Sequence, residues 1–237
     1  KAGAIQITLP EVNVWLEENQ EIGYLKIDRE NPSRMLVSEM MIFANSLMAE
    51  FLSNNNMPAV FRSQAQPKQR LFKGIETSLT LNFMQRKQLS RAIVGTDPEN
   101  HSGLGVKAYV TATSPIRRYH DLLTQRQIKA IFGYGKAYSK AELETILQSI
   151  SPAIANAGRV QASRKRYWIT KYLESKRGTA YEALVLDCHR DHYNVLIKEF
   201  MLEAKLPPSG IRLKNGDIVQ VTIQHADARR DQLSLFV

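Results

Sequence analysis

The sequence predicts an α+β fold, in which a larger part of mixed helices and strands is followed by a small all-β barrel. Residues 1–176 contain long stretches whose apolar side chains recur at helical spacing, with short alternating runs between them. Residues 177–237 instead alternate apolar and polar side chains over several short segments. A chain of 237 residues, 43 % of them hydrophobic, can bury one large core, or one medium and one small core. We therefore expect one domain over residues 1–176 and a second over residues 177–237.

The N-terminal part is expected to contain short strands followed by a long helix. Alternation predicts strands over residues 4–9, 12–16 and 20–27. Ser33 can cap a helix that runs to about Leu52. The apolar residues of this helix recur at helical spacing: Leu36, Met40, Phe43, Leu47 and Phe51. The methionines Met40, Met41 and Met48 are expected to fill the core rather than to form a cofactor site. Glu39 lies within the same helix, where a carboxylate is costly unless it is exposed, ion-paired or in contact with a ligand.

The middle of the chain is expected to be mostly helical. In order, the patterns predict an irregular basic segment (61–73), a helix (75–93), a turn-rich loop (95–105), a strand (106–113), a helix from Thr113 or Ser114 to about Phe132, and two further helices (140–149 and 153–176). The C-terminal strands are expected over residues 181–188, 192–199, 216–226 and 232–237. Four or five short strands in about sixty residues suit a small barrel of the OB type.

The composition favours a polyanionic partner. Lys and Arg total 32 against 23 for Asp and Glu, which gives a net charge of +9. Such a chain suggests nucleic acid first, although a merely basic surface would give the same count. The single cysteine, Cys188, cannot form an intrachain disulfide, no Cys/His cluster has zinc spacing, and a reducing cytoplasm is the default. No signal peptide is visible and no apolar run is expected to reach the length of a membrane span, so no membrane partner is expected. Because the chain begins at Lys1 without a Met, we expect it to be part of a longer protein.

The stretch "TSPIRRYHDLLTQR" places two arginines near the expected start of a helix. Thr113 or Ser114 can serve as the N-cap and Pro115 as the first helical residue. Arg117 would then lie beside free backbone N–H groups, an arrangement that is unfavourable alone and favourable when an anion binds there. The alternative is a local ion pair between Arg117 and Asp121, four residues later, which would stabilise the helix only weakly.

The longer stretch "HSGLGVKAYVTATSPIRRYHDLLTQRQIKAI", residues 101–131, resembles the signature of the ribonuclease II family. Three other stretches are similar to further family segments: "GAIQITLPEVNVWL", "RMLVSEMMIFANSLMAEFL" and "MPAVFRSQAQP". The resemblance covers nearly the whole chain. It implies the C-terminal portion of an RNB catalytic domain, with helices packed on a mixed sheet, followed by an OB-fold RNA-binding domain.

The resemblance also implies an activity. Members of the family are 3′-to-5′ exoribonucleases that hydrolyse single-stranded RNA with a divalent metal, usually Mg²⁺, and release 5′-nucleotides processively. The aspartates that hold the metal in the family would lie upstream of Ala4, so no metal ligand is expected in this chain, and the chain alone should be inactive. A non-catalytic RNA-binding module that retains the scaffold is the alternative, and a surface for a protein partner is a third reading.

Residue roles follow by position from the same resemblance. Arg117 matches the catalytic arginine of the family, and Glu39 matches a glutamate near the terminal nucleotide. The remaining substrate-binding candidates are Ser114, Arg118, Tyr119 and His101. The chain departs from the family pattern at Gln125, where a histidine is usual, and near Gln161, where some members have a glutamate.

The long basic helix expected over residues 153–176 supplies further candidates for RNA binding. Basic side chains with interleaved aromatics fit contact with single strands, and they equally fit a solvated helix whose aromatics pack inward. The candidates are Arg164, Arg166, Lys171 and, in the barrel, Tyr193. The segment "HRDHY" around Tyr193 fits a polar turn equally well. The expected location is the cytoplasm, with an organelle matrix as the alternative.

Overall fold

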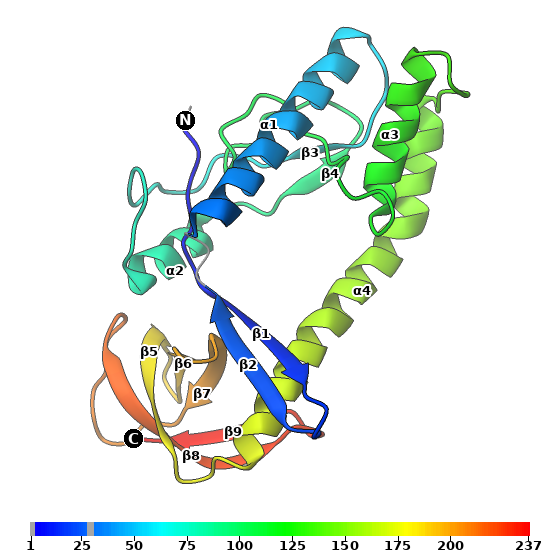
Figure 1. The fold of residues 1–237 in the computed structure, drawn as a ribbon. Helices are drawn as coiled ribbons and strands as arrows, with labels where there is room; N and C mark the ends of the chain where they lie inside the picture. The colour runs from blue at the N-terminus through cyan, green and yellow to red at the C-terminus, as the bar shows by residue number, and fades with distance from the viewer. Residues whose placement is uncertain (1–2, 28–30) are drawn as a thin grey trace. The chain divides into compact units, whose positions relative to one another are not determined.

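The computed structural model describes residues 3–27 and 31–237, and it combines helices with antiparallel strands, which confirms the predicted α+β class (Figure 1). Within the described residues, the chain forms two compact units. The first unit comprises residues 3–8, 31–77 and 84–154, and the second comprises residues 9–27, 78–83 and 155–237. These units are defined by internal contacts, so the domain boundary between residues 176 and 177 stays a prediction.

The helices and strands have the following bounds. The first unit contains α1 (Pro32–Asn54), β3 (Phe61–Ser63), β4 (Ile93–Gly95) and α3 (Tyr119–Ile131). Two helices contribute residues to both units, α2 (Leu79–Gln88) and α4 (Lys140–Glu174). The second unit contains β1 (Glu11–Leu16), β2 (Ile22–Ile27), β5 (Ala180–Cys188), β6 (Tyr193–Ile197), β7 (Leu202–Leu206), β8 (Ile218–Asp227) and β9 (Gln232–Phe236).

Helix α1 forms where it was predicted, but its buried face is a different one. The side chain of Asn31 caps its start by accepting the Ser33 N–H at 3.0 Å. Met40, expected in the core, is 64 % exposed, whereas Met48 is partly buried against the core. Leu36, Phe43 and Leu47 of the apolar stripe are each at least 47 % exposed. Asn45, Ala49 and Leu52 are the buried residues of the helix. The prediction was wrong because Ala49 and Leu52 pack with Phe61, Ala108 and Val110, and this contact sets the buried face.

By length and composition, α1 would be able to cross a membrane, so the expectation that no apolar run reaches that length was wrong. One such helix among the described residues is weak support for a membrane span, because the criterion rests on length and composition alone. Asn45 at its centre is 1 % exposed and donates to the Tyr109 hydroxyl. A buried, partnered amide of this kind is typical of a helix packed inside a protein.

Several predicted elements of the first 176 residues change in the structure. Residues 4–9 and 106–113 form no strand, although Val106 and Val110 make isolated bridges to His101 and Phe61. Strand β3 pairs with β4 in the antiparallel direction, whereas Gln64, directly after β3, forms a parallel bridge with His101. The helix expected over residues 75–93 is shorter, since α2 spans only Leu79–Gln88. The two helices expected around Pro152 are one continuous helix, α4, with Pro152 in its interior.

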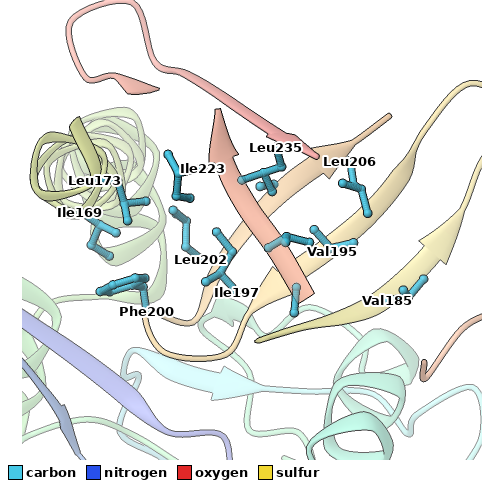
Figure 2. Packing of buried hydrophobic residues seen from close by; sticks show 13 residues of the cluster. Ile169, Leu173, Val185, Val195, Ile197, Phe200, Leu202, Leu206, Ile223 and Leu235 are labelled. Carbon is cyan, nitrogen blue, oxygen red and sulfur yellow. The ribbon is translucent and has the colours of Figure 1, made fainter. Parts of the chain in front are cut away.

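The C-terminal strands form the predicted antiparallel sheet, in the order β7-β6-β5-β8-β9. The two edge strands, β7 and β9, lie next to one another, so the sheet is nearly closed. Its core is continuous with one face of α4, as Figure 2 shows for Ile169, Leu173 and Phe200 beside the barrel residues. Burial of each such side chain contributes about 1.5–3 kcal/mol, so the end of α4 and the sheet stabilise each other.

Candidate functional site

The two arginines singled out in the sequence lie in a turn that precedes a helix. The N–H groups of Arg117 and Arg118 donate to the Ser114 carbonyl at 3.2 and 3.0 Å, which closes a turn over residues 114–118. Arg118 then adopts an extended conformation, with φ −129° and ψ 111°, and is the N-cap of α3. The predicted helix start at Thr113 or Ser114 was therefore wrong. An extended residue cannot continue a helix, and α3 begins only at Tyr119.

Asp121 fixes the position of this turn. Its Oδ2 accepts a hydrogen bond of 2.8 Å from the Ser114 N–H, and its side chain is fully buried. Its Oδ1 is buried without a recorded partner in the described part of the chain. The alternative of an Arg117–Asp121 ion pair is therefore not realised, because the carboxylate points into the protein and holds the backbone of the turn.

Two amide side chains hold the segment that leads into the turn. Asn45 on α1 accepts the Ala112 N–H at 3.1 Å. Gln125 on α3 donates to the Ala112 carbonyl at 2.7 Å. Both hydrogen-bonding groups of Ala112 are thus satisfied by side chains from different helices. Gln125, noted in the sequence as a departure from the family pattern, has a positioning role here. Asn45 was not predicted from the sequence as a functional residue, although a lone amide in an apolar helix can indicate a buried hydrogen-bond partner.

The tip of the turn presents positive charge to solvent. Arg117 and Arg118 are both exposed, Tyr119 is 43 % exposed, and Ile116 between the proline and the arginines is fully exposed. Among residues 3–27 and 31–237, no ion pair is recorded for either guanidinium. Two neighbouring cations without a carboxylate partner are suited to bind an anion such as a phosphate group.

His101 lies in the loop before this segment and is almost entirely buried. It is 7 % exposed, and its ring meets the Tyr109 ring edge-on at 5.7 Å between centroids. Burial lowers the pKa of His101, and the nearby charge of Arg62 lowers it further. Burial also lowers the pKa of His120, at the start of α3, against an opposing effect of Asp121 and with a further decrease from Arg62. Both imidazoles are therefore neutral at neutral pH.

Glu39 lies on α1 and is half-buried. It shares this helix with Asn45, whose side chain holds Ala112 in the segment before the turn. The structure thus brings Ser114, Arg117, Arg118 and Tyr119 together in one continuous turn and helix start. Glu39 and His101 lie outside this turn, on separate elements of the same unit.

The second unit holds a pocket of about 390 Å³ that contains one predicted RNA-binding residue. Arg164 and Trp168 on α4 line it together with Asn13 on β1. Arg164 is exposed and Trp168 is half-buried. A cation beside an aromatic face and an amide is a combination that suits a nucleotide. Gln161, the second departure from the family pattern, also lines this pocket.

The other three RNA-binding candidates make contacts within their own unit. Arg166 pairs with Asp231 at 2.5 Å and donates to the Glu203 carbonyl at 2.9 Å. Lys171 pairs with Glu174 at 2.6 Å. The Tyr193 hydroxyl donates to the Ile211 carbonyl at 3.3 Å, and its ring packs against the core of the sheet. These contacts occupy the polar groups that were predicted to meet RNA, and the prediction itself stays untested.

Acidic and histidine side chains do not gather into a metal-binding cluster in the part of the chain that the structure describes. Within the described ranges, no group of three or more His, Cys, Asp or Glu side chains is placed to hold a metal ion. The described residues therefore supply no ligand set of this kind for Mg²⁺.

Comparison with known families identifies the larger part of the chain. Residues 1–134 match the RNB domain. This match includes the turn, the two arginines and Asp121. It covers more than half of the 237 residues.

Curated relatives cover nearly the whole chain. It is 31 % identical over 242 residues to an uncharacterized ribonuclease from Synechocystis, a match covering 98 % of this chain and 35 % of the relative. It is 30 % identical over 251 residues to ribonuclease II, chloroplastic/mitochondrial, from Arabidopsis thaliana, covering 99 % of this chain and 30 % of that protein. The chain therefore spans about a third of the length of the curated relatives it matches.

Solved structures show the same fold over the whole chain. An active-site mutant of the Dss1 exoribonuclease from Candida glabrata superposes with a TM-score of 0.85 at 21 % identity, covering 100 % of this chain and 32 % of that one. RNase R from Mycoplasma genitalium, in complex with ribose-methylated single-stranded RNA, superposes with a TM-score of 0.76 at 16 % identity, covering 100 % and 46 %. At these identities the likeness establishes the fold.

Proposed function

Because this chain belongs to the RNB domain family, we propose that it is part of a 3′-to-5′ exoribonuclease that hydrolyses single-stranded RNA. The enzyme would release 5′-nucleotides processively. Relatives named ribonuclease II and ribonuclease R, and a fold shared with exoribonucleases, support this proposal. We expect the enzyme to act in the cytoplasm, or in an organelle matrix as the name of the Arabidopsis relative suggests for that protein.

The observation that best supports the proposal is the turn before α3, where Asp121 does not neutralise the positive charge of Arg117. Asp121, the carboxylate nearest in sequence, is turned inward to the Ser114 N–H, so it does not neutralise Arg117. Arg117 is held on a backbone that Asp121, Asn45 and Gln125 fix from two helices. A charge that is fixed before the substrate arrives can stabilise the transition state without reorganisation.

This charge suits the chemistry of phosphodiester hydrolysis. The phosphorus atom is shielded by negative oxygens, and negative charge grows on them as water attacks. Arg117, which stays protonated, would donate hydrogen bonds to these oxygens and act only electrostatically. Arg118 would bind a neighbouring phosphate, and Tyr119 would pack beside the terminal nucleotide. Ser114 would position the turn, and Glu39 would accept hydrogen bonds from the hydroxyls of the last ribose, which favours RNA.

We propose that the complete enzyme uses a divalent metal, with Mg²⁺ expected, to activate the attacking water. The described residues do not form such a site, so its ligands would come from residues other than these. The sheet of β5 to β9 would act as an OB-fold domain that guides single-stranded RNA. Arg164, beside Trp168, is the member of the second unit best placed for such contact.

A direction assay on the complete enzyme tests this function. With Mg²⁺ and unstructured RNA, a label at the 3′ end should appear at once in released mononucleotides, whereas a label at the 5′ end should stay in shortening chains. Cleavage inside the chain, or loss of the 5′ label first, would refute the proposed direction. Tight RNA binding without any hydrolysis would favour the non-catalytic module instead.

A further inference from the structure

Arg62 is an exposed arginine of the first unit to which the proposed function assigns no role. It lies in the middle of β3, and its backbone N–H donates to the Tyr109 carbonyl at 2.8 Å. Its backbone is therefore fixed, while its side chain is exposed. For residues 3–27 and 31–237, no hydrogen bond or ion pair of its guanidinium is recorded.

His101 lies next to the strand of Arg62. Gln64, two residues after Arg62, bridges to His101, and Tyr109, whose carbonyl accepts the Arg62 N–H, packs its ring against the His101 ring. The charge of Arg62 also lowers the pKa of both His101 and His120, after the larger effect of burial. His101 Nδ1 and His120 Nε2 are both buried and have no hydrogen-bond partner among the described residues. Such ring nitrogens are unusual, because buried polar atoms are normally hydrogen-bonded.

The surrounding contacts hold these groups in place. The Tyr109 ring packs edge-on against His101, and the Tyr109 hydroxyl accepts a hydrogen bond from Asn45 at 3.1 Å. Asn45 in turn holds Ala112, which precedes the turn of Arg117. The polar atoms left over are thus the guanidinium and one nitrogen of each imidazole.

The missing partner of such a group is an anion that also carries hydroxyls. A guanidinium binds phosphate oxygens through parallel hydrogen bonds. A neutral imidazole has one donor and one acceptor nitrogen and can therefore bond to a ribose hydroxyl or to a phosphate oxygen. A ribonucleotide unit of an RNA chain offers both kinds of partner.

We propose that Arg62 is a second phosphate-binding residue for RNA, separate from Arg117, and that His101 lines its subsite as an uncharged polar group. This inference rests on the proposed function, since it adds a contact to the same substrate. It assigns Arg62 to binding, whereas Arg117 acts on the linkage that is broken.

The test measures binding of a fluorescent, unstructured adenosine oligoribonucleotide to the chain as given, between about 50 and 200 mM salt. Arg62→Ala should weaken binding about tenfold, as expected for loss of a charged hydrogen bond. It should also lower the slope of log affinity against log salt by about 0.7, the value of one phosphate contact on a single strand. His101→Gln should weaken binding a few-fold with the slope unchanged, because it removes no charge.

Arg91→Ala is the matched control, because Arg91 is an exposed arginine of the same unit. It should leave the slope at its wild-type value. If wild-type protein binds RNA and Arg62→Ala keeps both affinity and slope, the inference about Arg62 is overturned while the proposed function stands. If the wild-type chain shows no salt-dependent RNA binding, the inference about Arg62 is overturned, while the direction assay on the complete enzyme decides the proposed function. Unchanged circular dichroism of Arg62→Ala confirms that the fold is intact.

Discussion

The carboxylate of Asp121 accepts the backbone N–H of Ser114 at 2.8 Å, across the turn that contains Arg117. The aspartate comes four residues after the arginine, a spacing at which the two could form an ion pair on a helix. Instead, the carboxylate is buried and anchors the backbone, and the arginine stays in solvent without it. One hydrogen bond thus fixes the turn and leaves its charge available.

Removal of this anchor should loosen the turn. Asp121→Ala leaves the Ser114 N–H without its acceptor, and loss of a hydrogen bond to a charged group costs about 1–3 kcal/mol. Hydrogen–deuterium exchange of residues 109–122 should become faster. Asp121→Asn keeps a carbonyl acceptor and is the control, and its exchange should stay near that of the wild type. Equal protection in the alanine variant would show that the turn does not depend on Asp121.

Arg117→Ala in the complete enzyme should lower turnover on the order of 10²–10³, the effect of removing one preorganised donor. RNA affinity should change much less, because Arg118 and the rest of the binding surface remain. Single-turnover hydrolysis and equilibrium binding, measured on the same preparation, separate the two effects. Arg118→Ala is the neighbouring control and should reduce turnover less. Near-wild-type turnover of the Arg117 variant would show that Arg117 is not a catalytic residue.

Arg166 should matter for stability, and Arg164 for RNA affinity. Arg166 links Asp231, at the approach to β9, with the Glu203 carbonyl on β7, so it joins the two edges of the nearly closed sheet. Its ion pair is partly exposed, and we expect Arg166→Ala to cost about 1 kcal/mol. Urea unfolding followed by tryptophan fluorescence reports on this unit, because Trp15 and Trp168 both belong to it.

Arg164→Ala is the matched comparison on the same helix. Arg164 lines the 390 Å³ pocket, so its loss should leave the urea midpoint unchanged and weaken RNA binding. The opposite pattern, with stability lost in the Arg164 variant and affinity lost in the Arg166 variant, would exchange the two assignments.

Acid should destabilise the first unit through His101 and His120. Their pKa values lie below the ordinary value of 6.5 in the folded chain, chiefly because of burial. As the pH falls below 6.5, the unfolded chain binds more protons than the folded chain, so the free energy of unfolding decreases. Above that pH both rings are neutral in both states, and they add no pH dependence.

Hydrogen–deuterium exchange of α3, corrected for the intrinsic effect of pH, measures this loss. Protection should decrease from about pH 7 to pH 5, and His120→Gln should reduce the decrease. Protection that grows towards acid would show that the imidazoles gain protons on folding.

Local patterns determined much of this protein. The alternation of residues 180–236 predicted the antiparallel sheet, and the apolar run after Asn31 predicted α1. These features arise from side chains only a few residues apart, which is why a linear reading finds them. The resemblance of residues 101–131 to ribonuclease II also points to the family that the RNB domain match establishes.

Tertiary contacts decided the rest. The sequence pattern placed Met40 of α1 in the core, whereas packing against Phe61 and Val110 buried Ala49 and Leu52 instead. Asn45 and Ala112 are 67 residues apart, and Arg166 and Asp231 are 65 apart, so no local pattern could reveal that these groups satisfy each other. Whether a polar or charged group is engaged or free depends on partners brought together by folding. Only the three-dimensional structure could therefore distinguish the engaged Arg166 from the exposed Arg62 and Arg117.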